Sequence, residues 1–281
     1  MPELPEVETV VRELAETLPG RTIREVKIIH GDLLQEPSEA FRRALLGSRI
    51  REVRRRAKNI LLGLSGPQIL VVNLGMTGRL LFRVPSTTSS GMGEGDDSSH
   101  PAILFTLEPE SSLLYDDARR FGRLERFDPR EWKAKSEQLG PEPLDPKLTS
   151  TLLHRRLLRS RTPIRSWLLN QHRIAGIGNI YAAEALFRAG IHPTRPARSL
   201  SHEEAKALLR ALRRVLREAI RVGGTTIRDY RTASGGAGGF RPFLRVYDRE
   251  GDPCPACNTP VERIVFGNRS AFFCPRCQGK E

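Results

Sequence analysis

All four cysteines of this 281-residue chain lie in two pairs near its C-terminal end, with the spacing C-x2-C-x16-C-x2-C. The pairs are Cys254 with Cys257 and Cys274 with Cys277. Two tight turns that each present two thiolates can complete a closed tetrahedral zinc site. Because sulfur would fill every ligand position and leave none for a catalytic water, we expect one structural Zn2+. Two disulfides are the alternative, which a reducing cytoplasm disfavours.

The segment between the two cysteine pairs has a strand-like composition. Residues 261–266 and 270–273 predict two short strands, and Gly267-Asn268-Arg269 predicts the turn that joins them. The C-terminal segment is therefore expected to be a zinc ribbon with Arg269 at its tip. By itself, an arginine at such a tip is only a surface charge.

The N-terminal half begins with a helical pattern and then changes to strand patterns. Apolar residues recur at helical spacing in residues 5–18, where a proline is tolerated in the first turn. Short β-rich runs follow over residues 22–127, with one helix expected at residues 39–46. The clearest runs are residues 69–72, 80–84 and 103–107. This half is therefore expected to be a two-sheet β-sandwich with flanking helices.

The second half of the chain is predicted to be helical. The polar, glycine-rich residues 86–99 predict a mobile surface loop, and the Pro-rich residues 139–146 predict a linker. Helical patterns follow the linker at residues 148–159, 163–170, 179–189 and 201–222. The fold class is therefore expected to be α+β. The expected parts are an N-terminal catalytic domain (1–135), a linker (136–150), a helical domain (151–240) and a zinc ribbon (241–281).

Basic residues outnumber acidic residues, which indicates a polyanionic partner. The sequence has 46 Lys and Arg against 33 Asp and Glu, a formal net charge of +13. A ribosome-like protein or a merely soluble basic surface is compatible with the same composition. No apolar run approaches the roughly 20 residues of a membrane-spanning helix. The acidic N-terminus lacks the layout of a signal peptide, so a soluble cytoplasmic protein is expected.

A glycine motif precedes one of the predicted helices. Residues 175–179, with the sequence AGIGN, lead directly into the helix expected at 179–189. The exposed backbone N–H groups of such a helix start can hold a phosphate. A G-x-G pair alone is more often a simple capping turn. Together with the second helix after Ser201 and the ribbon, the motif becomes specific.

Four sequence motifs and the terminal cysteines follow one another along the chain. The motifs are MPELPEVET at the start, NLGMTG at residues 73–78, DARRFG at 117–122 and GIGNIY at 176–181. Over nearly the whole chain these motifs resemble the bacterial formamidopyrimidine-DNA glycosylase family. The related endonuclease VIII shares the terminal proline, the helix-two-turn-helix module and the ribbon, but usually begins PEGPE. The resemblance implies a bifunctional DNA glycosylase and AP lyase that removes oxidised purines.

The resemblance implies that Pro2 is the nucleophile, once Met1 has been removed. The imine that a proline amine forms at the anomeric carbon of the sugar can act as an electron sink for β,δ-elimination. An N-terminal amine titrates near 8, so an appreciable fraction is neutral at cellular pH. Glu3 would move protons during opening of the sugar ring and the eliminations. Glu6 would be a supporting carboxylate.

Two basic residues complete the catalytic set that the resemblance implies. Lys58 would reach the damaged base or an adjacent phosphate and assist β-elimination. Arg269 would grip a phosphate near the lesion and take part in the second elimination. The arginines near Lys58 are expected to form a solvated basic face that acts on DNA only through its field. These arginines are Arg51, Arg54, Arg55 and Arg56.

Removal of a base from the duplex stack leaves a gap, at a cost on the order of a few kcal/mol. The resemblance places Met76, Arg119 and Phe121 in that gap. The phenyl ring would wedge into the stack, and the arginine would face the orphaned base. Without the resemblance, Met76 and Phe121 would be interpreted as core residues.

Further DNA contacts follow from the resemblance alone. The expected contacts are Asn73, His100, Arg161, Arg165 and Asn179. Asn73 and Arg165 stand where the family usually has histidine and lysine, so the strength of DNA binding is expected to differ while the reaction survives. The glycine-rich residues 233–239 align with a loop that caps the flipped base in the family.

Three functions stay open at this point. The favoured function is the glycosylase and lyase for oxidised purines such as 8-oxoguanine and formamidopyrimidines. The alternatives are an endonuclease VIII-like enzyme for oxidised pyrimidines and a catalytically idle protein that binds damaged DNA. The expected partner is double-stranded DNA with oxidised bases or abasic sites, bound by a monomer. An idle binder has no need of a free Pro2 followed by Glu3.

Overall fold

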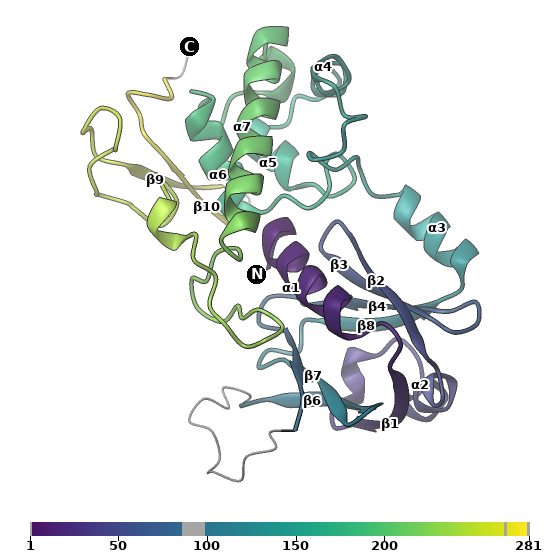
Figure 1. Cartoon of the computed structure of the whole chain (residues 1–281). Helices are drawn as coiled ribbons and strands as arrows, with labels where there is room; N and C mark the ends of the chain where they lie inside the picture. Colours follow the sequence, from purple (N-terminus) through teal and green to yellow (C-terminus); the bar gives the residue numbers. More distant parts are fainter. Residues whose placement is uncertain (1, 86–98, 267–268, 280–281) are drawn as a thin grey trace. The chain divides into compact units, whose positions relative to one another are not determined.

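The computed structural model describes residues 2–85, 99–266 and 269–279, in two compact units (Figure 1). The first unit comprises Met1–Ser136 and Val222–Gly239, and the second comprises Glu137–Arg221 and Phe240–Glu281. Nearly all of the loop expected at 86–99 and the first two residues of the expected ribbon turn lie outside the described residues. None of the described helices has both the length and the apolar character that a membrane span requires.

The first unit begins with helix α1 (Leu4–Thr17), in agreement with the helix expected at residues 5–18. Glu3 and Glu6 form a capping box at its start, in which each side chain satisfies a backbone N–H group of the other residue. One face of α1 enters the core and contacts β2 and β3. The core residues on this face include Val7, Val10 and Leu14.

Two antiparallel sheets of four strands form the body of the first unit, as the sequence predicts. The first sheet has the order β1 (Thr22–Ile28), β6 (Pro101–Glu108), β7 (Ser111–Asp116), β5 (Arg79–Arg83). The second sheet has the order β2 (Ile50–Arg56), β3 (Asn59–Leu64), β4 (Ile69–Asn73), β8 (Arg123–Phe127). Alternate apolar residues of both sheets share one buried cluster with α1. This packing confirms the two-sheet architecture.

Shorter elements flank the sheets. A 3-10 turn, η1 (Gly31–Leu33), precedes α2 (Ser38–Leu45), which agrees with the helix expected at 39–46. Helix α3 (Pro129–Glu137) follows β8 and was not expected. No residue of α3 is buried, so its sequence has no apolar stripe from which a helix could be predicted.

Val222–Gly239 groups with the first unit, although it follows the last long helix of the second unit. The Thr225 N–H donates to Glu6 Oε1 at 2.8 Å, and the Tyr230 hydroxyl donates to the Glu6 carbonyl at 3.2 Å. The Phe82 N–H donates to the Ala233 carbonyl at 2.9 Å. This grouping differs from the expected helical domain 151–240, because such long-range hydrogen bonds leave no local pattern in a sequence.

The second unit contains the expected helices and a two-stranded ribbon. Its helices are α4 (Ser150–Leu158), α5 (Ile164–Leu169), α6 (Asn179–Arg188) and α7 (His202–Arg221). The 3-10 turns η2 (Ala197–Ser199) and η3 (Arg241–Phe243) lie before and after α7. Strands β9 (Glu262–Phe266) and β10 (Arg269–Phe273) pair antiparallel, as expected for the ribbon.

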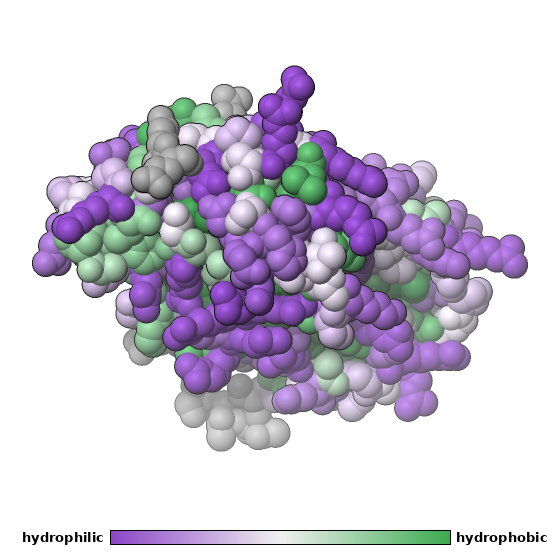
Figure 2. Space-filling model, turned by 90° about the horizontal axis from the view of Figure 1, so that it is seen from above, coloured by the Kyte–Doolittle hydropathy of each residue, from purple (hydrophilic) through white to green (hydrophobic). Residues whose placement is uncertain are grey.

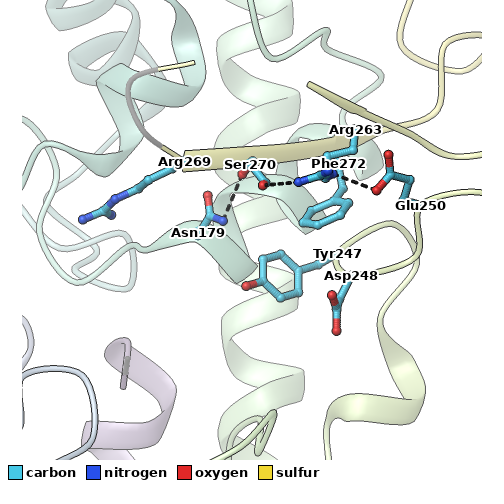
Figure 3. A pocket seen from close by; sticks show the side chains of 8 residues that line it. All are labelled: Asn179, Tyr247, Asp248, Glu250, Arg263, Arg269, Ser270 and Phe272. Carbon is cyan, nitrogen blue, oxygen red and sulfur yellow. Dashed lines mark hydrogen bonds and ion pairs between the residues drawn. The ribbon is translucent and has the colours of Figure 1, made fainter. Parts of the chain in front are cut away.

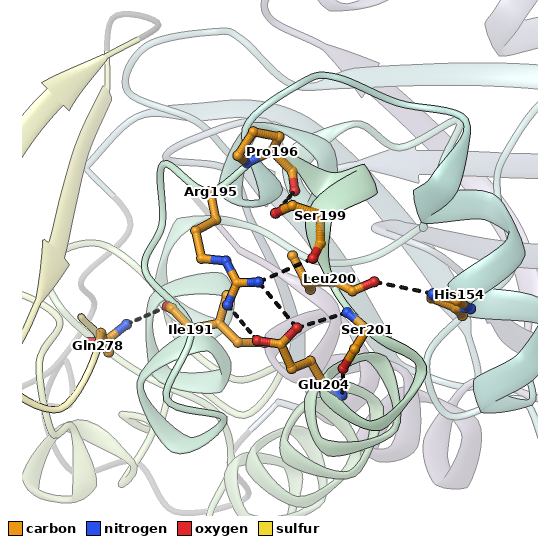
Figure 4. A network of polar contacts seen from close by, with 9 residues as sticks. All are labelled: His154, Ile191, Arg195, Pro196, Ser199, Leu200, Ser201, Glu204 and Gln278. Carbon is orange, nitrogen blue, oxygen red and sulfur yellow. Dashed lines mark hydrogen bonds and ion pairs between the residues drawn. The ribbon is translucent and has the colours of Figure 1, made fainter. Parts of the chain in front are cut away.

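A polar network fixes the turn between α6 and α7 (Figure 4). Ser201 and Glu204 form a reciprocal cap at the start of α7, with the Ser201 N–H 2.7 Å from Glu204 Oε2 and the Glu204 N–H 3.1 Å from Ser201 Oγ. The Arg195 guanidinium pairs with the same carboxylate. Nearby, Gln278 donates to the Ile191 carbonyl at 2.8 Å. Gln278 thereby joins the end of the ribbon to the helical turn.

Candidate active site

The chain end that carries Pro2 is held by the capping box of α1. Pro2 is buried, Glu3 is 2% exposed and Glu6 is 1% exposed. The Glu3 N–H donates to Glu6 Oε2 at 2.7 Å, and Glu6 Oε1 accepts the Thr225 N–H at 2.8 Å. Both carboxylates also lie at the helix N-terminus, whose positive end favours negative charge. The structure therefore brings the three predicted residues of the N-terminus together at one rigid helix start.

Lys58 lies in the turn between β2 and β3 and is half-buried. The preceding residue, Ala57, has a positive φ of 54°, and its carbonyl accepts a hydrogen bond from Arg55 Nη1 at 3.0 Å. Arg55 Nε also pairs with Glu8 Oε2 at 2.7 Å. This ion pair ties the turn that carries Lys58 to α1, the helix that positions Pro2.

The basic face expected around Lys58 is only partly correct. Arg51 and Arg54 are exposed, but the Arg55 side chain is 10% exposed and paired with Glu8. Arg56 Nε donates to Ser136 Oγ at 3.1 Å. The expectation was wrong for these two residues because each contacts another element of the first unit: Arg55 pairs with Glu8 of α1, and Arg56 contacts Ser136 of α3.

Met76 and Phe121 are large apolar side chains at the surface of the first unit, 40% and 54% exposed. This exposure rules out the core interpretation of both residues. The Arg119 guanidinium lies over the Phe121 ring, 4.6 Å from its centroid. Asn73 donates to Asn59 Oδ1 at 2.9 Å and accepts the Gly75 N–H at 3.0 Å.

His100 is an exposed residue directly before β6. Its N–H donates to Asp116 Oδ2 at 2.7 Å, and its carbonyl accepts the Asp117 N–H at 3.0 Å. The ring Nδ1 lies 2.6 Å from Ser99 Oγ. The backbone of His100 is therefore fixed against the end of β7 while its side chain faces solvent.

Arg165 joins the start of α6 to the ribbon within the second unit. It is 1% exposed, and its Nη2 donates to Asn179 Oδ1 at 2.5 Å and to the Ser270 carbonyl at 2.6 Å. The guanidinium stacks 4.8 Å from the Phe266 ring centroid. Burial, and secondly the charge of Arg269, lower the pKa of Arg165 to about 10, so it stays charged at neutral pH. Arg165 makes all of these contacts inside the protein, and its expected contact with a DNA phosphate stays a prediction.

A pocket of about 560 Å³ opens beside Asn179 and the ribbon (Figure 3). It is lined by Asn179, Tyr247, Asp248, Glu250, Arg263, Arg269, Ser270 and Phe272. Arg263 Nε pairs with Glu250 Oε2 at 2.7 Å, whereas the Arg269 side chain extends away from that pair. No sequence motif marks Tyr247 or Arg263, so neither was a predicted site residue.

Arg161 is another expected DNA contact. It is exposed and lies just before α5.

Glu184 of α6 is a third residue that no sequence motif marks. It is 0% exposed, and its Oε1 accepts the N–H groups of Arg245, Val246 and Tyr247, each at 3.0 Å. Burial raises the pKa of Glu184, against the opposing effect of these hydrogen bonds. The carboxylate therefore fixes the backbone that carries Tyr247 into the pocket.

The four cysteines meet the geometric requirements of a zinc site. Their Sγ atoms all lie within 4.8 Å of one another. Three of the Sγ–Sγ distances are 3.4, 3.5 and 3.9 Å, and a tetrahedral site with Zn–S bonds of about 2.3 Å places sulfurs about 3.8 Å apart. None of the four cysteines is in a disulfide, which excludes the disulfide alternative. The ribbon thus holds one structural Zn2+ through Cys254, Cys257, Cys274 and Cys277.

Figure 2 shows the hydropathy of one face of the molecule. The face in Figure 2 consists mainly of hydrophilic side chains, with smaller hydrophobic patches between them.

Comparison with protein families gives three matches along the chain. Residues 1–124 match the Formamidopyrimidine-DNA glycosylase N-terminal domain, and residues 139–231 match the Formamidopyrimidine-DNA glycosylase H2TH domain. Residues 251–279 match the zinc finger found in FPG and IleRS. The first two matches together cover most of the chain.

Full-length relatives agree with these matches. The formamidopyrimidine-DNA glycosylases of Thermus thermophilus and Chloroflexus aurantiacus are 46% and 43% identical, and the alignments cover 100% and 99% of this chain and 99% and 98% of theirs. The crystal structure of the MutM (Fpg) protein from Thermus thermophilus aligns with a TM-score of 0.86 at 43% identity, over 100% of both chains. Lactococcus lactis Fpg in complex with abasic-site DNA aligns with a TM-score of 0.89 at 28% identity, over 99% of this chain and 100% of that one.

Proposed function

Because this chain belongs to the formamidopyrimidine-DNA glycosylase family, we propose that Pro2, held by the capping box of α1, is the nucleophile of its reaction. The protein is a DNA base-excision repair enzyme, a DNA-formamidopyrimidine glycosylase with AP lyase activity that acts on duplex DNA with oxidised bases. The observation that carries the assignment of Pro2 is the hydrogen bond from the Glu3 N–H to Glu6, which fixes the chain end.

The first step forms a bond between the Pro2 nitrogen and the anomeric carbon of the damaged nucleotide. The glycosidic bond breaks, and the base leaves with its electron pair and takes up a proton. The nitrogen loses its own proton and its lone pair forms the imine as the sugar ring opens. The Glu3 carboxylate takes up the proton that the nitrogen loses and passes it to the ring oxygen, after which it is again available as a base.

The imine then serves as the electron sink for strand cleavage. Removal of a proton from the adjacent carbon expels the 3′ phosphate, and a second elimination expels the 5′ phosphate. Lys58 assists the first elimination, supported by its position in a turn that the Arg55–Glu8 pair ties to α1. Arg269 grips a phosphate for the second elimination, and its exposure on the ribbon leaves it accessible to DNA.

Met76, Arg119 and Phe121 fill the gap that the extruded base leaves. Their support is exposure: two large apolar side chains at the surface, with an arginine stacked on one of them, suit insertion between bases. The remaining proposed DNA contacts are Asn73, His100, Arg161, Arg165 and Asn179. Asn179 begins α6, where backbone N–H groups favour a phosphate.

The substrate is DNA, so we place the enzyme in the bacterial cytoplasm. The family name favours oxidised purines as lesions. One observation favours a second substrate class, because Lactococcus lactis Fpg, 28% identical to this chain, forms a complex with DNA that contains an oxidised pyrimidine. We therefore propose oxidised purines as the preferred lesions and oxidised pyrimidines as secondary ones.

Single-turnover cleavage of matched duplexes tests this preference. The duplexes differ only in one base, which is 8-oxoguanine, a formamidopyrimidine or an oxidised pyrimidine. Faster release of both purine lesions is the expected result. Faster release of the pyrimidine lesion would assign the enzyme to the endonuclease VIII-like class instead.

A further inference from the structure

Two loops of the first unit carry the side chains proposed to fill the duplex gap. The first loop, residues 73–78, carries Met76, and the second loop, residues 117–122, carries Arg119 and Phe121. The loops follow different strands, β4 and β7, of different sheets. A contact between the two loops is needed if their side chains are to enter DNA together.

The carboxylate of Asp117 bonds to both loops. Asp117 is 1% exposed, so its charge must be satisfied inside the protein. Its Oδ1 accepts the Thr77 hydroxyl of the first loop at 2.5 Å and the Arg119 N–H of the second loop at 3.3 Å. Its Oδ2 accepts the Gly122 N–H at 2.9 Å. The same carboxylate therefore reaches the residue after Met76 and the residue after Phe121.

Tyr115, near the end of β7, also links the two loops. Its hydroxyl lies 3.2 Å from Asp117 Oδ2 and 3.3 Å from the Asn73 carbonyl, so one proton can serve either acceptor. Burial, and secondly the nearby charge of Asp117, raise the pKa of Tyr115. The hydroxyl therefore stays protonated and remains a donor at physiological pH.

Glycine allows the backbones of the two loops to touch. Gly75 has a φ of +57°, and a Cβ there would lie 2.5 Å from the Phe121 carbonyl carbon and 2.5 Å from the Gly122 nitrogen. A Cβ on Gly122 would lie 1.6 Å from Tyr115 Oη. The close approach and the hydrogen bonds of Asp117 occur at the same place, where the two loops meet.

We propose that Asp117 is a positioning residue for base extrusion, which holds the two loops as one body so that Met76, Arg119 and Phe121 enter the duplex together. The inference rests on the proposed gap-filling role of those side chains. Extrusion requires work against stacking and pairing, on the order of a few kcal/mol. If the two loops moved independently, their side chains would offset less of this cost of base extrusion.

Asp117→Asn tests this role, because asparagine has a single amide oxygen and cannot accept both the Thr77 hydroxyl and the Gly122 N–H as the two carboxylate oxygens do. The variant should excise 8-oxoguanine from a paired duplex about tenfold more slowly, the effect of losing hydrogen bonds to a charged group. Cleavage at a preformed abasic site, where no base has to be extruded, should change much less. Placing the lesion in a mismatch, which lowers the cost of extrusion, should restore part of the rate.

Thr77→Val and Ser111→Ala provide matched comparisons. Thr77→Val removes one hydrogen bond to Asp117 and keeps nearly the same side-chain shape. It should lower the ratio of the 8-oxoguanine excision rate to the abasic-site cleavage rate, but less than Asp117→Asn does. Ser111 is a buried hydroxyl at the other end of β7, bonded to Arg21 and to the Pro109 carbonyl. Ser111→Ala should leave the ratio unchanged, whatever it does to thermal stability.

Equal slowing of both reactions, or no slowing, in Asp117→Asn would overturn the inference. If that variant is unfolded at the assay temperature, Thr77→Val decides by the same ratio. Failure of the proposed function has a different signature: the wild-type protein would then cleave neither substrate through Pro2, whereas failure of the inference leaves the wild type active.

Discussion

Glu6 and Thr225, 219 residues apart in the sequence, are joined by a hydrogen bond of 2.8 Å between the Glu6 carboxylate and the Thr225 N–H. The other oxygen of the same carboxylate accepts the Glu3 N–H at 2.7 Å. One buried side chain therefore holds both the chain end that carries Pro2 and the segment that returns to the first unit after α7.

We expect Glu6→Gln to weaken both the fold and the catalytic step. Glutamine offers one side-chain acceptor for two backbone donors, so one N–H is left unsatisfied, at a cost of about 1–3 kcal/mol in the free energy of unfolding. Formation of the imine should slow while DNA affinity changes little, which single-turnover trapping and binding titrations measure separately. Glu13→Gln is the control, because Glu13 accepts the Ser234 N–H of the same segment at a more exposed place. A normal trapping rate in Glu6→Gln would contradict the supporting role.

Acid should destabilise the first unit partly through Glu8. Burial alone would raise the pKa of Glu8, but hydrogen bonds and charges from Arg55 and Arg12 outweigh it and hold the pKa below its ordinary value. A carboxyl with a lowered folded pKa stabilises the protein above its unfolded pKa, about 4.3, and this stability is lost as the pH falls through the folded pKa. Glu8→Gln should therefore unfold more easily at pH 7 and depend less on pH below about 4.

Chemical denaturation at a series of pH values measures this dependence. Glu16→Gln, an exposed substitution on the same helix, is the control and should follow the wild-type curve. An equally steep loss of stability in Glu8→Gln below about pH 4 would show that the Arg55–Glu8 pair is not a source of the acid sensitivity.

Arg161 and Arg165 should respond differently to removal of their charge. Arg161→Met should reduce the salt dependence of DNA binding by about one phosphate contact and leave the melting temperature unchanged, since Arg161 is exposed. Arg165→Met should lower the melting temperature as well, because it removes the bonds to Asn179 and Ser270. Binding titrations across salt concentrations and thermal melts distinguish the two effects. A melting temperature unaffected by Arg165→Met would rule out its structural contribution.

Removal of zinc should weaken DNA binding without touching the chemistry at the N-terminus directly. The ribbon carries Arg269 and depends on the ion to fold, so chelation or Cys277→Ser should unfold it. Binding titrations before and after chelation, with zinc added back, measure the effect. Unchanged affinity in the metal-free protein would count against a role of the ribbon in binding DNA.

The sequence predicted the elements that leave a local pattern. Apolar spacing indicated α1 and the long helices, and cysteine spacing indicated the zinc site. It did not predict α3, which has no buried face, or the return of residues 222–239 to the first unit. Arg55 pairs with Glu8 because folding brings the two side chains together. No local sequence pattern shows such a pair.

The candidate site was predictable to a different degree. The resemblance named the residues with proposed chemical roles, such as Pro2 and Lys58, and these roles stay predictions. It gave no role to Glu184, which binds backbone N–H groups of residues 245–247, or to Asp117, which accepts the Thr77 hydroxyl of another loop. Such residues become recognisable only when the folded chain shows which donors surround a buried carboxylate.

Borohydride reduction during the reaction tests the central assignment most directly, because it converts the imine between enzyme and DNA into a stable bond. Proteolysis and mass spectrometry of the trapped complex then locate the attached residue. The account predicts attachment at the nitrogen of Pro2, and no adduct in a form whose N-terminus is extended so that this nitrogen lies in a peptide bond. An adduct on a lysine, or one undiminished by the extension, would contradict it.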